Sequence, residues 1–410
     1  MSLGFFEKEK THRPITAADL PKCGECGLKS GCVNPMMPVS GSGKSRVLIV
    51  LPRPHGIDDR ANKWITGGRR SILEGGLKSA GLTWDDVWLT GATICGSDEK
   101  ADPKQIDFCR PNIMKTMAEL DPDVVVLAGQ APIRSVIQPT WIKSISNYDP
   151  WIYGGWNIPS HFYNRWICPT YDPTYVRDQE ANGKPSAPVA DLWFREHLFQ
   201  IKKLIGTRPF DVDPPDYTKQ VEVIRDSDEA AYRIRRFLSS TKPATIDIET
   251  NRLKPDHNGS KIRSCAVHCS GEVVSYLWEG GAIDATLELM RSDVPKIGAN
   301  SKFEDRWFGV LYNTHYNNLI FDTMLVAHCL DNRGTKSDDE KSPGLSSVKF
   351  QGYVRLGVTW SGKMDAYFES GDDGWNRVFD APVEDLLIYN GMDVLIEHKI
   401  AVLQRKESGI

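Results

Sequence analysis

The chain has 410 residues, of which 40% are hydrophobic, 25% charged and 10% aromatic, a composition that excludes a disordered protein. Its longest apolar runs are strand-sized, which excludes a membrane helix of about 20 residues. Its first residues lack the apolar stretch of a secretory signal, which favours the reducing cytoplasm. The net charge of −4 excludes an overall positive field, so any contact with nucleic acid must be local.

The first half of the chain alternates apolar runs of strand length with helical patterns. We expect strands at Val47–Leu51, Val87–Ile94 and Val124–Ala128. We expect helices at Ser71–Ser79, Pro103–Leu120 and Pro188–Leu204. This alternation predicts a parallel sheet with helices on its faces.

A proline-rich segment divides the chain. Between Gly206 and Thr218, three prolines and small polar residues interrupt every periodic pattern, as in a linker. Because a single core rarely exceeds about 250–300 residues, we expect domains at 1–205 and 219–410, joined by residues 206–218. After the linker we expect strands at Glu222–Ile224, Thr245–Ile248 and Ser264–Leu277, and a helix at Ser227–Leu238. The second domain is therefore also predicted to be α/β.

Nine cysteines are unevenly distributed along the chain. An odd number in a reducing compartment is a poor match to a disulfide framework. Cys23 and Cys26 form a CxxC, Cys95 follows a predicted strand, and Cys109 lies near the start of a predicted helix. Four thiolates suit either a structural Zn²⁺ or an iron–sulfur cluster, and the spacing does not separate the two. We expect Cys32 and Cys168 to be core thiols.

Three segments of the second half carry acidic residues. TIDIETNRL holds Asp247 and Glu249, whose spacing of two places both on one face of a strand. IGANSKFEDRWF holds Glu304 and Asp305, and in YNGMDVLI Tyr389 and Asp393 are one helical turn apart. This oxygen-rich chemistry is typical of Mg²⁺ or Mn²⁺ sites, and two such ions catalyse phosphodiester hydrolysis.

These segments, in this order, resemble the three exonuclease motifs of the proofreading domain of family A DNA polymerases, within the DEDD superfamily. The resemblance runs from about Glu222 to the C-terminus and includes FDTML at 321–325. It implies an RNase H-like fold, a single-stranded DNA 3′ end as substrate and two bound Mg²⁺ or Mn²⁺ ions.

The resemblance also implies a role for each matching residue. The metal ligands would be Asp247, Glu249, Glu304 and Asp393, and Tyr389 would orient the attacking water. The 3′-terminal nucleotide would be contacted by Thr250, Leu253 and Asn300. The family usually has Asp where Glu304 stands; Glu offers the same oxygens one methylene further out, and Asp305 is the alternative ligand.

The first half, from about Leu20 to Leu204, resembles family 4 uracil-DNA glycosylases. That resemblance implies a [4Fe–4S] cluster on Cys23, Cys26, Cys95 and Cys109. The family's catalytic residues are replaced here: Pro52 stands at the acidic position of the first motif, Gly91 at the uracil-reading Asn, and Asp172 at the catalytic His. We therefore expect no glycosylase activity and a role in binding DNA or a partner.

The two resemblances together are similar to the front end of some bacteriophage DNA polymerases. The sequence contains no polymerase motifs and stops soon after Asp393, so we expect the polymerase on a separate chain or in a missing segment. The expected function is the proofreading part or subunit of such an enzyme, acting in the host cytoplasm. The alternatives are an RNA-trimming exonuclease and a non-catalytic scaffold of a replication complex.

Overall fold

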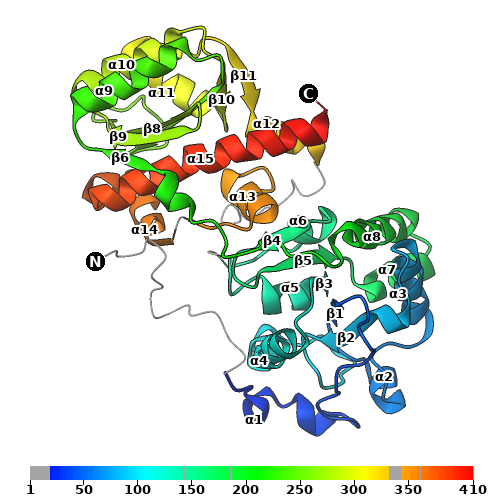
Figure 1. The fold of residues 1–410 in the computed structure, drawn as a ribbon. Helices are drawn as coiled ribbons and strands as arrows, with labels where there is room; N and C mark the ends of the chain where they lie inside the picture. The colour runs from blue at the N-terminus through cyan, green and yellow to red at the C-terminus, as the bar shows by residue number, and fades with distance from the viewer. Residues whose placement is uncertain (1–18, 142–143, 185–186, 332–343, 361, 410) are drawn as a thin grey trace.

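The computed structural model describes residues 19–141, 144–184, 187–331, 344–360 and 362–409. They form two β-sheets, each covered by helices (Figure 1). The mixed α/β fold class with two sheets, predicted from the sequence, is confirmed. In this part of the chain, no helix combines the length and the apolar surface that crossing a membrane requires.

The first sheet is parallel except at one edge. Its strands lie in the order β2 (Val87–Gly91), β1 (Val47–Leu51), β3 (Val124–Ala128), β5 (Arg165–Thr170) and β4 (Ile158–Ser160). Only β4 runs antiparallel to its neighbour. Both β1 and β3 are buried along their whole length, as in parallel strands covered on both faces.

In the described part of the first half, eight α-helices accompany this sheet. They are α1 (Cys23–Cys26), α2 (Gly56–Ala61), α3 (Gly67–Ser79), α4 (Pro103–Leu120), α5 (Gln130–Val136), α6 (Asp149–Tyr153), α7 (Pro173–Ala181) and α8 (Ala187–Ile201). The sequence predicted the bounds of α4, whose N-terminus is capped by Asp102 and by a proline at the first helical position. It predicted β2 three residues too long, because the chain leaves the sheet after Gly91.

The second sheet has the strand arrangement of an RNase H-like fold. Its order is β11 (Leu319–Asp322), β10 (Lys296–Gly298), β7 (Ala244–Thr250), β8 (Ile262–Cys269), β9 (Glu272–Leu277) and β6 (Glu222–Ile224). Strands β7, β8 and β9 form an antiparallel meander, and β10 and β11 continue parallel to β7. The segment predicted as strands at 264–277 is the β8–β9 hairpin.

Helices cover both faces of this sheet. The described helices of this half are α9 (Ser227–Arg236), α10 (Gly280–Arg291), α11 (Lys302–Tyr312), α12 (Thr323–Leu330), α13 (Val348–Leu356), α14 (Asp365–Phe368) and α15 (Val383–Ser408), of which α13 and α14 lie beyond the helices that contact the sheet. Alternate residues of β8 face opposite sides: Cys265 and Val267 join the core under α9 and α10, and Ala266 joins the core under α15. With 26 residues, α15 is about 39 Å long and crosses the sheet (Figure 1).

Helix α13 joins the two halves of the chain. It lies between α15 and β4 (Figure 1), and its Phe350 and Tyr353 belong to the hydrophobic core of the first half. The Phe350 ring packs edge-on against Trp151, with 4.9 Å between centroids. The hydroxyls of Tyr353 and Thr140 lie 2.7 Å apart, at hydrogen-bonding distance. A segment that follows the second sheet in sequence therefore completes the first core.

Replacing Phe350 by Ala tests the contribution of α13 to the hydrophobic core of the first half. Phe350 is 1% exposed, and removing a buried phenyl ring costs about 3–5 kcal/mol. The free energy of unfolding, measured by urea denaturation, should fall by this amount. The control Phe199→Ala, at a residue that is 51% exposed, should change it by less than about 0.5 kcal/mol. Equal small effects of the two changes would contradict the shared core.

Candidate metal centre and cysteine site

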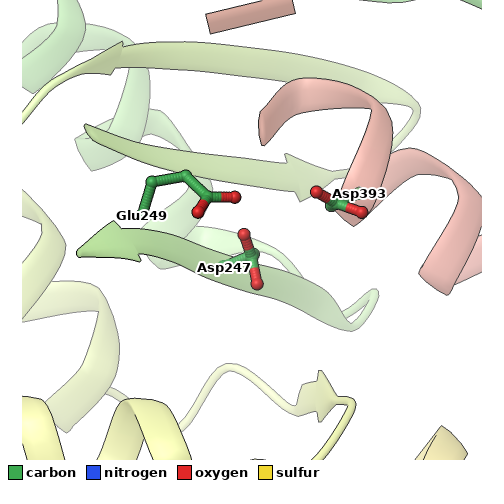
Figure 2. Close-up of side chains that lie close together, drawn as sticks. All are labelled: Asp247, Glu249 and Asp393. Atoms are coloured by element: carbon green, nitrogen blue, oxygen red, sulfur yellow. The ribbon is translucent and has the colours of Figure 1, made fainter. Parts of the chain in front are cut away.

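Three carboxylates meet between β7 and α15. Asp247, Glu249 and Asp393 each offer one oxygen, and these oxygens lie within 4.8 Å of one another (Figure 2). Along β7, Ile246 and Ile248 are buried in the core on the other face of the sheet. Because side chains alternate along a strand, the two acidic residues share the opposite face, toward α15. The sequence predicted this shared face.

The strand changes course just after the acidic pair. The register of β7 against β8 shifts between Glu249 and Thr250, a bulge of the kind that re-aims side chains next to functional sites. The Thr250 hydroxyl donates to the carbonyl of Arg252, at 2.8 Å. The regular ladder therefore ends where the carboxylates are presented.

Burial and mutual repulsion keep these carboxylates from ionising easily. Burial raises the pKa of Asp247 well above its ordinary range, with the charges of Glu249 and Asp393 adding to it. Burial and Asp393 do the same to the pKa of Glu249. Burial raises the pKa of Asp393 to about 6, opposed by Lys349. A hard divalent cation relieves this repulsion and takes oxygen ligands, so the donor set fits Mg²⁺ or Mn²⁺.

Two fully buried donors orient the carboxylates. The side-chain amide of Asn390 donates to Asp247 Oδ2 at 2.6 Å and accepts a hydrogen bond from the Ser264 hydroxyl at 3.0 Å. The indole N–H of Trp360 donates to Asp393 Oδ1 at 3.0 Å. Partners of this kind hold a metal ligand in its binding orientation. Sequence reasoning missed both residues, although Asn390 stands beside Tyr389 in the third motif.

Tyr389 lies one turn before Asp393 and is buried. Its ring packs on Phe368, with 5.0 Å between centroids, and Lys349 Nζ lies 4.9 Å from the ring centroid. Lys349 also lies 3.8 Å from an oxygen of Asp365. Burial and the charge of Asp393 raise the pKa of Tyr389 well above its ordinary value, so its hydroxyl stays protonated at neutral pH. Sequence reasoning did not single out Lys349, which α13 brings to the site.

The second motif is placed differently from the first and third. Glu304 is buried on α11 but does not belong to the group of three oxygens. Burial raises its pKa to about 8. Asp305, the predicted alternative ligand, accepts the amide N–H of Tyr316 at 2.8 Å and lies 3.0 Å from His315 Nδ1. The Asp305 carboxylate therefore holds the chain after α11.

The three predicted nucleotide contacts differ in accessibility. Leu253 is 73% exposed just beyond the acidic pair. Asn300 is exposed and has a left-handed φ of 59°, with its amide N–H donating to Asp322. Thr250 is buried and its hydroxyl bonds to the backbone. Leu253 and Asn300 are therefore free to meet a ligand, and the Thr250 hydroxyl is not.

Four cysteines line one cavity at the edge of the first sheet. Cys23 and Cys26 come from α1, Cys95 follows β2, and Cys109 lies in α4. The amide of Met36 donates to the Cys95 sulfur at 3.4 Å, and burial raises the pKa of that thiol to about 12. In the part of the chain that the structure describes, no three sulfurs lie within 4.8 Å.

The other two cysteines of the first half differ from each other. Cys168 is buried, as expected of a core thiol. Cys32 is only half-buried, and its thiol donates to the carbonyl of Lys29 at 3.5 Å. The expectation of a second core thiol was therefore wrong, because Cys32 lies in the surface segment after α1.

The positions of the glycosylase motifs hold structural contacts. A Cβ on Gly91 would lie 2.7 Å from the Trp64 ring, so that ring occupies the space where a longer side chain would start. Asp172 caps α7 by accepting the Thr174 amide at 2.8 Å. The nearby Asp58 forms a buried, two-bond ion pair with Arg69, at 2.8 and 2.9 Å.

The first half of the chain is similar to uracil-DNA glycosylases. A family model for the uracil DNA glycosylase superfamily matches residues 38–195. The type-4 uracil-DNA glycosylase of Archaeoglobus fulgidus is 24% identical over 114 residues, 27% of this chain and 57% of that protein. The resemblance predicted for the first half is confirmed at the level of this superfamily.

A longer match covers both halves. The DNA polymerase of Bacillus phage SP01 is 22% identical over 348 residues, 76% of this chain and 35% of the phage protein. The chain thus spans about a third of that polymerase and little more than half of the glycosylase. Among solved structures, Escherichia coli RNase D, an exoribonuclease involved in structured RNA processing, matches 46% of each chain at 13% identity and a TM-score of 0.33.

The raised pKa values predict how metal binding depends on pH. The pKa of Asp393 is about 6 and that of Glu304 about 8, so both bind protons more tightly in the folded chain than in the unfolded one. Without metal, their contribution to stability is present in acid and lost as the pH rises through these values. Because a cation competes with the same protons, the affinity for Mn²⁺ should rise with pH from about pH 5 to about pH 8.

Calorimetric titration with Mn²⁺ across this interval measures the effect. In Asp393→Asn the part of the rise near pH 6 should disappear. An affinity that stays constant across the interval would contradict the assignment of these carboxylates to a metal centre.

Proposed function

We propose that this chain is a metal-dependent 3′→5′ DNA exonuclease and forms the proofreading part of a phage-type family A DNA polymerase. The observation that carries the proposal is the convergence of Asp247, Glu249 and Asp393 from two separate motifs onto one site. The match to a phage DNA polymerase along 76% of the chain supports DNA as the substrate.

Each side chain of the site has a role in this proposal. The carboxylates of Asp247, Glu249, Glu304 and Asp393 hold the cations, and Tyr389 donates its hydroxyl proton to position the attacking water. Leu253 packs against the terminal base, and Asn300 contacts the same nucleotide. When bound, two divalent cations activate the water and stabilise the leaving 3′-oxygen. The positive charge of Lys349 lies beside Tyr389, where it offsets negative charge on the substrate phosphate.

For the first half we propose a binding role without glycosylase activity. Pro52 offers no carboxylate, the Trp64 ring fills the space beside Gly91, and Asp172 adds a negative charge where a uracil anion would develop, which opposes its formation. The proposed partner is the polymerase, on a separate chain or in a further segment, in the cytoplasm of an infected bacterium. The proposed domain ranges remain 1–205 and 219–410.

Digestion of a 5′-labelled single-stranded DNA oligonucleotide with Mg²⁺ or Mn²⁺ tests the activity. We expect a ladder that shortens from the 3′ end. Asn390→Ala should slow it about 10–100-fold, the usual effect of losing a partner of a metal ligand, and Asp247→Ala should slow it more. The control Asp284→Ala changes an exposed residue of α10 and should digest normally.

The same assay decides between the alternatives. Faster digestion of an RNA oligonucleotide would favour the RNA-trimming exonuclease. An oligonucleotide that stays intact with both metals, and also after the cognate polymerase is added, would favour the scaffold and overturn the proposal.

We also propose that the four cysteines hold a [4Fe–4S] cluster. Protein purified without oxygen should contain iron and acid-labile sulfide in equal amounts, and Cys109→Ser should lose most of both. The control Cys329→Ser, at an exposed cysteine, should retain them. One equivalent of zinc and no iron would instead identify a zinc site.

A further inference from the structure

An open groove lies at the end of the second sheet where β7 carries its acidic pair. It has a volume of about 450 Å³ and is lined by the start of β8, the end of β9, parts of α10 and α11, and Phe379. Trp278 and Tyr312 of this lining pack against the core under α9 and α10, and Val378, next to Phe379, belongs to the core under α15. The lining therefore comes from both faces of the sheet.

Arg263 reaches the groove from an irregularity in the sheet. Glu249 pairs with Ser264 and Thr250 pairs with Ile262, so Arg263 is the extra residue of the bulge between these two pairs. A bulge re-aims the side chain of its extra residue. Arg263 lines the groove, and its Nε is buried without a hydrogen-bond partner among the described residues.

The groove carries more positive than negative charge. Two cations, Lys261 and Arg263, and one carboxylate, that of Glu279, lie in its lining. Within the described part of the chain, neither cation forms an ion pair with an Asp or a Glu, and Lys261 is exposed. In a chain with a net charge of −4, this is a local site for an anion such as a phosphate.

Two aromatic rings with arginines over them flank the end of β7. The guanidinium carbon of Arg263 lies 5.1 Å from the centroid of the Phe379 ring, and that of Arg252 lies 4.5 Å from the Trp375 ring. Phe379 is 42% exposed, so its ring can also meet a ligand. Aromatic rings combined with Arg side chains are the surface on which single-stranded nucleic acids stack their bases.

The segment that carries both rings is fixed to the acidic strand. The side-chain amide of Asn376 donates to the carbonyl of Thr250 at 2.8 Å, and its backbone N–H donates to the carbonyl of Asn251 at 3.1 Å. Trp375 also forms an isolated β-bridge with Arg252. These bonds hold the rings beside the residues that follow Glu249.

We propose that this groove binds the single-stranded DNA behind a 3′ end held at the metal centre. Phe379 stacks on a base, and Lys261 and Arg263 each contact a phosphate. A nucleic acid strand supplies both a phosphate for each cation and a flat base for each ring, which an acidic peptide does not. The inference rests on the proposed function and adds to it a binding site away from the carboxylates.

The salt dependence of DNA binding tests the role of the cations. A fluorescently labelled single strand is titrated with the full chain without divalent metal, so that it is not digested, and its anisotropy is measured. Wild type should bind the strand, and Lys261→Gln should reduce the slope of log affinity against log salt by about 0.7, the loss of one phosphate contact. The control Lys406→Gln, at an exposed position of α15, should keep the wild-type slope.

The same titration tests the ring. Phe379→Ala should weaken binding by about tenfold, as expected for the loss of one stacked base. The control Phe199→Ala removes a ring that is 51% exposed on α8 and should bind with wild-type affinity. Wild-type affinity and slope in Phe379→Ala and Lys261→Gln would overturn the proposal. Weaker association of these variants with the cognate polymerase, with unchanged DNA binding, would also overturn it and identify a protein-binding surface.

The outcomes separate this inference from the proposed function. Weaker DNA binding in Phe379→Ala and Lys261→Gln, in a chain that digests no DNA with Mn²⁺, would support the groove and overturn the exonuclease. Digestion by wild type, with unchanged DNA affinity in both variants, would support the exonuclease and overturn the groove.

Discussion

The candidate site of the second half is governed by the repulsion among carboxylates that are held close together and partly buried. Asp247, Glu249 and Asp393 lie within 4.8 Å, where each raises the energy of ionising the others. A fold tolerates such a group only if the surrounding structure holds it in place, and here that support is visible. The amide of Asn390 holds Asp247 and the indole of Trp360 holds Asp393, while the register of β7 shifts just after Glu249. The repulsion among these carboxylates favours the binding of a divalent cation, because the cation's positive charge relieves it.

In the first half, two buried acidic residues have bonding partners within the protein. Its acidic residues are neutralised by the protein itself: Asp58 is paired with Arg69 in the interior, and Asp59 accepts the amides of Val33 and Asn34. Groups with all their bonds made have nothing left for a ligand. The sulfurs of Cys95 and Cys109, by contrast, line a cavity and receive only weak N–H bonds. The two halves therefore place their binding capacity in different chemistry, oxygen in one and sulfur in the other.

The sequence predicted what depends on local spacing. The shared face of Asp247 and Glu249 follows from the period of a strand, and the turn between Tyr389 and Asp393 from the period of a helix. It did not predict contacts that depend on how elements pack. Strand β4 is three residues long, Lys349 reaches the site from a helix bound to the other core, and Asn390 acts through a strand more than a hundred residues earlier. The contacts of Asp305 with His315 and with the Tyr316 amide likewise depend on how the loop after α11 packs.

The packing of α13 links the two halves of the chain independently of the segment that connects them. One side of this helix is buried in the core of the first half, through Phe350 and Tyr353, and the other lies against α15. The polypeptide between residues 206 and 218 is therefore not what holds the two halves together. A cut in that segment would leave two fragments in contact through the aromatic residues of α13. Neither fragment is a complete folding unit, because the first lacks part of its core and the second exposes it.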